Sequence, residues 1–373
     1  MARTNSVNFT GANQFPMASA GTDIFKKEDV QVLAKSTDLH DHSPGLGLPV
    51  SAASIPAGAI DGSKITDGTI TSAKIQDGTI ATADLANQSV TNAKLGTDTA
   101  RLNLLTNGGF EIWQRGNGPF TTNGFAADRW SVNLAGTDTM SVTRDTTNID
   151  ASLGSVAAAA CVVTVGTGGG STSFFQVLKQ ADGPGLSGRT MSASIRLRCA
   201  TANAARVGFY NGASYTYSNF HTGDGTWQTL TSTVTCTGST WQVGIWFSAS
   251  CTAYVDNAML VVGSVPADYA PLHPADDLAR CLRYYEVIGE AMNITTYMAA
   301  ASQSYGVYIN YKVPKAVTPT ITIKAGWTAA NCSQPTNVGS SAIAMTLQTT
   351  IPAAGAFQLA APSPPAITVE ANP

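Results

Sequence analysis

The chain has 373 residues, of which 12% are charged, and its formal net charge is −3 with an isoelectric point near 5.8. This balance supplies no basic surface for a phosphate backbone, so we expect no nucleic-acid binding. No apolar stretch approaches the roughly 18 residues that a membrane-spanning helix needs, so we expect no membrane insertion. The first residues also lack the apolar segment of a secretory signal peptide.

Residues 1–50 are predicted to be an N-terminal segment that attaches the protein to a larger particle. Residues 23–37 can form one short helix, with Asp23 as its N-cap and with Val30 and Leu33 on one face. A helix of this length is marginal alone, so we expect it to pack on a neighbour.

Two histidines, His40 and His42, stand directly before a Pro-Gly pair. In an extended segment they point to the same side. Around a threefold axis, two imidazoles from each chain would form an octahedral transition-metal site. The segment resembles phage fibre tips that hold iron in this way, and the alternative is a solvated turn.

Residues 51–100 carry an apolar residue at every fifth position, and residues 1–100 contain no Trp or Tyr. A period of five fits neither a helix nor a flat strand. Asp-Gly pairs at fixed offsets predict turns, so each ten-residue repeat should combine an extended piece with a turn. The apolar ladder consists of Ile55, Ile60, Ile65, Ile70, Ile75, Ile80, Leu85, Val90 and Leu95.

One apolar residue in five cannot close a core within one chain. Three chains around a common axis could bury each ladder residue against its two copies, at about 1.5–3 kcal/mol for each fully buried side chain. We therefore predict an intertwined homotrimeric stalk, with a flexible low-complexity linker as the alternative.

Residues 103–270 read as short strands separated by turns, which predicts a β-sandwich of jelly-roll type. Alternation from Trp241 to Phe247 indicates a half-buried strand, and Asn211-Gly212 indicates a hairpin between residues 206–210 and 214–220. Further strands are expected at 174–179, 191–199 and 226–235. The six cysteines form no C-x-x-C pair, so buried free thiols are favoured over disulfides.

The ends of this domain resemble jelly-roll carbohydrate-binding modules. Residues 103–111 (NLLTNGGFE) are similar to their opening strand, and residues 253–260 (AYVDNAML) to their closing strand. The resemblance implies a structural calcium held by Asn107, Glu111 and Asp256, whose oxygen donors suit that ion. The alternative is that Glu111 and Asp256 bond backbone groups where the strands meet.

Such modules bind sugar with exposed aromatic side chains. The candidates here are Trp246, Trp227, Tyr215 and Tyr217. Trp246 lies on the outward phase of its strand, so it is the first expected to stack on a glycan, with a contact to a neighbouring subunit as the alternative.

Residues 271–373 are predicted to be a C-terminal β tip domain that begins with a helix from Pro274 to Glu286, acidic at its start and basic at its end. The string at 281–285 (CLRYY), followed by the extended piece 313–320, resembles phage tail and fibre proteins. From Ile321 onward the only charged residues are Lys324 and Glu370, a surface suited to contact rather than to acid–base chemistry.

Taken together, these features predict a mostly β, elongated homotrimer: a structural phage tail fibre protein of the virion. We expect it to attach to other virion tail proteins by residues 1–50, to bind a host-surface glycan through its distal β-domains, and to have no enzymatic activity. The alternatives are a head fibre or baseplate protein without a receptor role, or a secreted carbohydrate-binding module protein.

Overall fold

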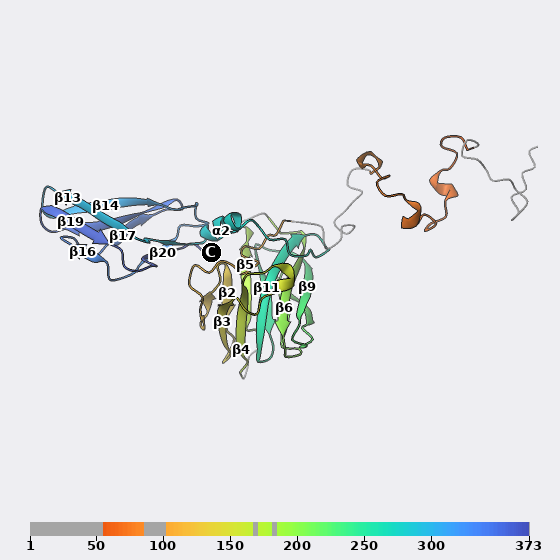
Figure 1. Ribbon diagram of the computed structural model, residues 1–373, viewed down its shortest axis with the longest axis horizontal. Coiled ribbons are helices and arrows are strands. Elements are labelled where there is room, and N and C mark those ends of the chain that lie inside the picture. Colours follow the sequence, from red (N-terminus) through yellow and green to blue (C-terminus); the bar gives the residue numbers. More distant parts are fainter. Residues whose placement is uncertain (1–54, 86–101, 167–170, 181–184, 373) are drawn as a thin grey trace, which may run out of the picture. The chain divides into compact units, whose positions relative to one another are not determined.

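The structure, a computed structural model, describes residues 55–85, 102–166, 171–180 and 185–372 (Figure 1). The predicted attachment segment 1–50 with its helix, His40 and His42, and the ladder residues Val90 and Leu95 lie outside the described residues. The described chain is mostly β, as predicted, and none of its helices is long and apolar enough to span a membrane. It divides into two compact units, Met1–Asp84 and Leu85–Pro373.

The first unit repeats one backbone pattern every ten residues. Short 3₁₀ helices η2 (Gly62–Lys64), η3 (Ser72–Lys74) and η4 (Thr82–Asp84) alternate with turns closed by bonds such as Thr69 N to Thr66 O at 3.1 Å. Gly68 and Gly78 take φ values of +77° and +78°, which only glycine adopts readily. The period of ten and the Asp-Gly turns are confirmed, although each repeat contains a 3₁₀ turn that the sequence pattern did not predict.

The apolar ladder, which runs through this unit to Leu85 at the start of the second, lies open to solvent on the single chain. Its seven described members, Ile55 through Leu85, expose between 38% and 56% of their surface. A single chain therefore builds the repeat but does not bury its apolar residues.

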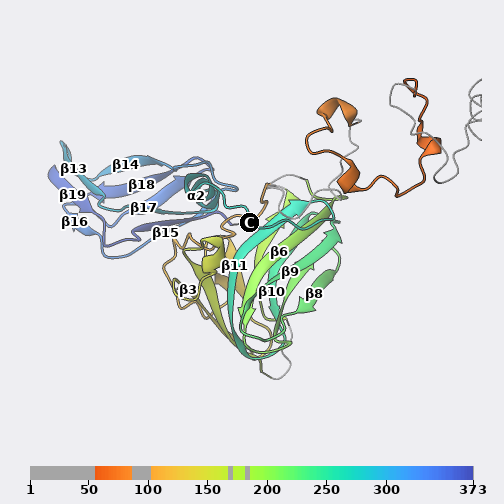
Figure 2. The ribbon, with the colours of Figure 1, turned by 45° about the vertical axis from the view of Figure 1, so that its right-hand side comes forward.

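The second unit begins with a sandwich of two antiparallel sheets (Figure 2). The six-stranded sheet has the order β1 (Gly124–Phe125), β2 (Trp130–Asn133), β5 (Ser173–Lys179), β10 (Thr240–Phe247), β7 (Ala205–Tyr210) and β8 (Tyr215–Phe220). The five-stranded sheet has the order β3 (Thr139–Asp145), β4 (Ala158–Thr164), β11 (Cys251–Val262), β6 (Thr190–Cys199) and β9 (Trp227–Thr235), with a 3₁₀ turn η6 at Ala151–Leu153. The predicted strands and the Asn211-Gly212 hairpin are confirmed.

The core of the sandwich lies between the two sheets and is centred on aromatic side chains. The rings of Phe110 and Trp130 lie 4.6 Å apart, and Phe174 lies 5.5 Å from Trp130. All six cysteines are free thiols, five of them buried, as predicted. The opening segment runs beside β11, where Leu104 N donates to Leu260 O and Ala258 N donates to Gly108 O.

Helix α2 (Pro274–Leu282) leads into three small antiparallel sheets. Their strands are β12 (Tyr285–Ile288), β20 (Ile367–Glu370) and β15 (Thr320–Ile323); β13 (Asn293–Met298), β19 (Gly355–Ala360) and β16 (Thr328–Ala330); and β14 (Gln303–Asn310), β18 (Ala344–Ile351) and β17 (Thr336–Ser340). The helix has the predicted acidic start and basic end, and His273 Nδ1 accepts a bond from Ala275 N.

The predicted extension of this helix to Glu286 is wrong. The helix ends at Leu282, and Tyr285 already pairs with Glu370 in the β12–β20 ladder. The physical reason is a set of bonds back to the sandwich: Gln114 Nε2 donates to Tyr285 O at 3.0 Å, and Arg115 pairs with Glu370 at 2.5 Å.

Candidate carbohydrate-binding face

The outer face of the six-stranded sheet carries the candidate site. Along β10, Trp241, Val243 and Ile245 point into the sandwich core, so the alternate residues Gln242, Gly244 and Trp246 lie on the opposite face. The same alternation places Arg206, Gly208 and Tyr210 of β7 on that face. The site is therefore built by strand periodicity on a sheet whose inner side is fixed by the core.

A glycine on β7 makes room for the largest side chain of this face. A Cβ on Gly208 would lie 2.4 Å from Cε3 of Trp246 and 2.8 Å from its Cδ2. The indole therefore lies across the β7 backbone, where any side chain at position 208 would displace it. This close approach lets Trp246 of β10 reach aromatic residues of β8, two strands away.

Strand β8 completes an aromatic cluster over Trp246. Tyr215 and Tyr217 stack on each other with centroids 5.9 Å apart and an interplanar angle of 7°. Each meets the indole edge-on, at 5.4 Å and 6.2 Å respectively. The ring of Tyr210 lies 4.9 Å from that of Tyr215. The ring of Phe175 lies 6.0 Å from that of Trp246. We call this set, with Arg206 and Gln242, the aromatic face.

Polar groups fix the orientation of the two tyrosines. The guanidinium of Arg206 lies 3.8 Å from the ring centroid of Tyr217, and Tyr215 Oη donates to Gln242 Oε1 at 2.9 Å. A tyrosine phenol is protonated at neutral pH, and burial, followed by the neighbouring Tyr217 and Tyr210, raises the pKa of Tyr215 further; its phenol is therefore a hydrogen-bond donor. An aromatic surface with a few fixed polar groups is the chemistry that recognises the apolar and hydroxyl faces of a sugar ring.

Trp246, the first residue expected to stack on a glycan, is almost fully buried in the single chain. Trp246 does lie on the outward phase of its strand, but only 4% of it is exposed because Tyr215, Tyr217 and Phe175 surround it. Tyr215, 42% exposed, is the most exposed ring of the cluster. Trp227 belongs to β9 of the other sheet and does not join this cluster.

Several members of the aromatic face were not among the predicted candidates. Arg206, Tyr210, Phe175 and Gln242 occupy outward positions on the same sheet. The alternation of β5, β7 and β10 contained this signal, since every second residue of each strand shares the face of Trp246.

Two residues of the expected calcium site, Asn107 and Asp256, make hydrogen bonds to backbone groups. Asn107 Nδ2 donates to Ile112 O and its Oδ1 accepts from Ile112 N. The Asp256 carboxylate accepts from Asn257 N at 2.7 Å and from Asp150 N at 3.4 Å, which is the alternative considered from the sequence. Within the described ranges, no group of three or more His, Cys, Asp or Glu side chains is placed to hold a metal ion.

Glu111 is exposed, and its environment is acidic. Burial and the neighbouring Asp277 raise the pKa of its carboxyl, while Arg144 opposes them. Asp277 itself accepts a bond from Asn107 N at 2.9 Å. Asp277 therefore joins α2 to the opening segment.

No protein-family model matches the chain, and no curated protein matches its sequence. Among solved structures, the enzymatically active domain of tailspike protein 4 from bacteriophage CBA120 is similar at 13% identity and a TM-score of 0.32, over 43% of this chain. The match spans 21% of that tailspike chain.

Xylan-binding domains are similar at the same level. The CBM22-1 domain of Paenibacillus barcinonensis Xyn10C is 14% identical, with a TM-score of 0.30, over 45% of this chain and 100% of its own. The tandem CBM22-1–CBM22-2 domain of the same protein is 10% identical, with a TM-score of 0.28, over 69% of this chain and 97% of its own. TM-scores in this range establish neither a shared fold nor a shared ligand.

Proposed function

We propose that the protein is a non-catalytic, homotrimeric phage tail fibre protein that binds a host-surface glycan. Its stalk would be the periodic ladder, residues 1–50 would attach it to the virion, and the aromatic face would contact the glycan. The observation that carries this proposal is the exposure of every described ladder residue on a single chain.

The exposed ladder supports assembly because of its regularity. Seven large apolar side chains, from Ile55 to Leu85, recur at one period on a backbone whose turns are internally bonded. Large apolar residues exposed at a regular spacing favour an interaction site. Copies of the same chain present the same period, so identical chains can bury the ladder at every level.

The aromatic face supports the glycan contact. Its most exposed ring, Tyr215, is held by Gln242 and by the stacked Tyr217, so it is oriented before a ligand arrives. Preorganised aromatic contacts bind at a low entropic cost. The residues contributed by β10, β7 and β8 are set by the core beneath them rather than by loops.

The proposal can be tested by binding the full-length protein to an array of bacterial surface polysaccharides. Tyr215→Ala should weaken the best binding by roughly tenfold, the equivalent of about 1.4 kcal/mol for one lost aromatic contact. Tyr297→Ala is the matched control, since Tyr297 is a tyrosine of β13 that is 69% exposed. If no polysaccharide binds, or if the two variants behave alike, the glycan role of this face is wrong.

A further inference from the structure

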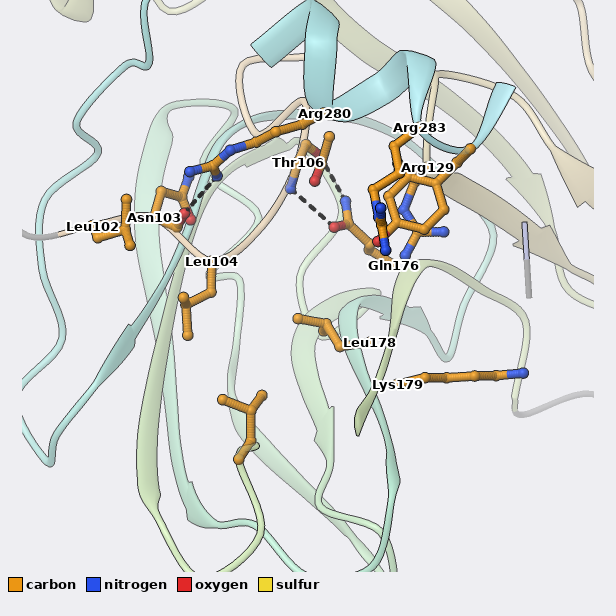
Figure 3. Close-up of a pocket in the computed structure, with 12 residues that line it drawn as sticks. Leu102, Asn103, Leu104, Thr106, Arg129, Gln176, Leu178, Lys179, Arg280 and Arg283 are labelled. Atoms are coloured by element: carbon orange, nitrogen blue, oxygen red, sulfur yellow. Dashed lines mark hydrogen bonds between the residues drawn. The ribbon is translucent and has the colours of Figure 1, made fainter. Parts of the chain in front are cut away.

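A cavity of about 250 Å³ lies between the opening segment of the sandwich, strand β5 and the end of α2 (Figure 3). It is separate from the aromatic face. Its described lining includes four basic residues, Arg129, Lys179, Arg280 and Arg283, and no acidic one. Such a lining attracts an anion.

The wall of the cavity is fixed by hydrogen bonds. The buried amide of Gln176 spans the opening segment, accepting from Thr106 N at 3.0 Å and donating to Thr106 O at 2.7 Å. Arg280 Nη1 donates to Asn103 O at 3.0 Å. Figure 3 shows both residue pairs joined by dashed lines. The site is therefore formed before any ligand enters it.

The guanidinium of Arg283 has no hydrogen-bond or ion-pair partner among the described residues. Arg283 is anchored through its backbone, where its carbonyl accepts from Ala316 N at 2.9 Å. Its side chain is half-buried and makes no hydrogen bond or ion pair to any described residue. A nearby carboxyl, Asp277, interacts with Arg280 rather than with Arg283. Arg283 thus offers a planar pair of donors that matches a carboxylate or phosphate.

The remaining lining limits the ligand. Leu104, Leu178 and Leu186 form an apolar wall, and Figure 3 shows Leu104 and Leu178 on the side away from α2. The volume is below the roughly 300–1,000 Å³ of pockets that take drug-sized ligands. We propose that this cavity binds one acidic sugar unit, whose carboxylate pairs with Arg283 while an apolar face of the ring lies on the leucines. This site goes beyond the proposed function and does not depend on the aromatic face.

In the test, the full-length protein is titrated separately with D-glucuronate, D-glucose and inorganic phosphate. Binding is measured by ligand-observed NMR. Glucuronate should bind measurably and more tightly than both other probes. Arg283→Gln should weaken glucuronate binding by about tenfold or more, as expected for the loss of a charge-assisted pair. Arg189→Gln, at an exposed arginine outside the cavity, should leave it unchanged.

Lys179→Gln provides a second variant, because Lys179 lies at the edge of the cavity and its ammonium points away in Figure 3. It should weaken glucuronate less than Arg283→Gln does, and its effect should shrink with added salt. Equal binding of phosphate, equal binding of glucose, or no binding of glucuronate would each overturn the assignment. An Arg283→Gln protein that melts like the wild type and binds glucuronate equally well would also overturn it.

Discussion

The guanidinium of Arg129 lies 3.6 Å from the ring centroid of Tyr284, and this contact joins the sandwich to the C-terminal sheets. A parallel contact places Arg115 3.7 Å from the ring of Tyr285. Both tyrosines belong to the string 281–285 that resembles phage fibre proteins. In this chain the string serves as a joint: its cysteine and leucine end α2, and its tyrosines receive two arginines of the sandwich.

A buried ion pair lies behind this joint and predicts a large stability effect. Lys315 Nζ is 2.5 Å from Glu286 Oε2 and from Leu282 O, and both side chains are almost fully buried. Lys315→Met leaves Glu286 buried without its counter-ion, so we expect a loss of about 3–5 kcal/mol.

The measurement is urea unfolding at fixed protein concentration. The double variant Lys315→Met, Glu286→Gln removes both charges and should recover much of the loss. If the single and double variants are equally unstable, the ion pair is not the source of the effect.

A second prediction concerns the space beneath Trp246. Gly208→Ala places a methyl group 2.4 Å from the indole, which is held on three sides by aromatic rings. We expect a loss of about 1–3 kcal/mol together with a changed tryptophan fluorescence. Gly306→Ala is the matched control, because the nearest atom to its new methyl would be 3.6 Å away. Equal behaviour of the two variants would contradict the packing described here.

A third prediction concerns pH. Burial raises the pKa of Asp256 to about 7, whereas an unfolded Asp titrates near 4. At a pH between these two pKa values, Asp256 is protonated in the folded state but ionised in the unfolded chain. The contribution of Asp256 to the free energy of unfolding therefore falls as pH rises, by at most about 1.4 kcal/mol per pH unit.

Asp256→Asn should remove that slope. Urea unfolding at several values from about pH 5 to about pH 8 should give a flatter profile for the variant than for the wild type, with the variant the more stable or equal of the two at the upper end. Parallel profiles would show that Asp256 does not titrate in this window.

A fourth prediction concerns the ladder. Replacing Ile70 and Ile75 by Asp would place like charges from every chain on the common axis, so we expect the assembly to dissociate. Ser72→Asp with Gln76→Asp adds the same charge at exposed positions off the ladder and should leave the assembly intact. Sedimentation velocity distinguishes the two, and dissociation of both variants would mean that charge alone is responsible.

Local patterns in the sequence predicted much of the sandwich. The Asn211-Gly212 hairpin followed from a glycine that takes a φ of +101°, and Trp241 to Phe247 followed from alternation. The end of α2 was missed because Tyr284 and Tyr285 are drawn out of the helix by Arg129 and Arg115, which lie more than 150 positions earlier in the chain.

The sequence predicted on which face of the sheet the site residues lie, but not how much of each side chain is exposed. Alternation placed Trp246 on the outer face correctly, yet its burial depends on Gly208 and on two tyrosines of another strand. The basic cavity had no sequence signal, because Asn103, Arg129, Gln176 and Arg283 meet only after folding. Properties that require several distant segments are the ones that a local pattern does not contain.

The central claim, that the ladder drives assembly of three chains, is tested most directly by the solution mass of the full-length protein, measured by multi-angle light scattering. The account predicts a stable species at three times the chain mass of 38.5 kDa, unchanged on dilution through the micromolar range. A stable monomer of 38.5 kDa would contradict it, because the exposed ladder residues would then have no partner.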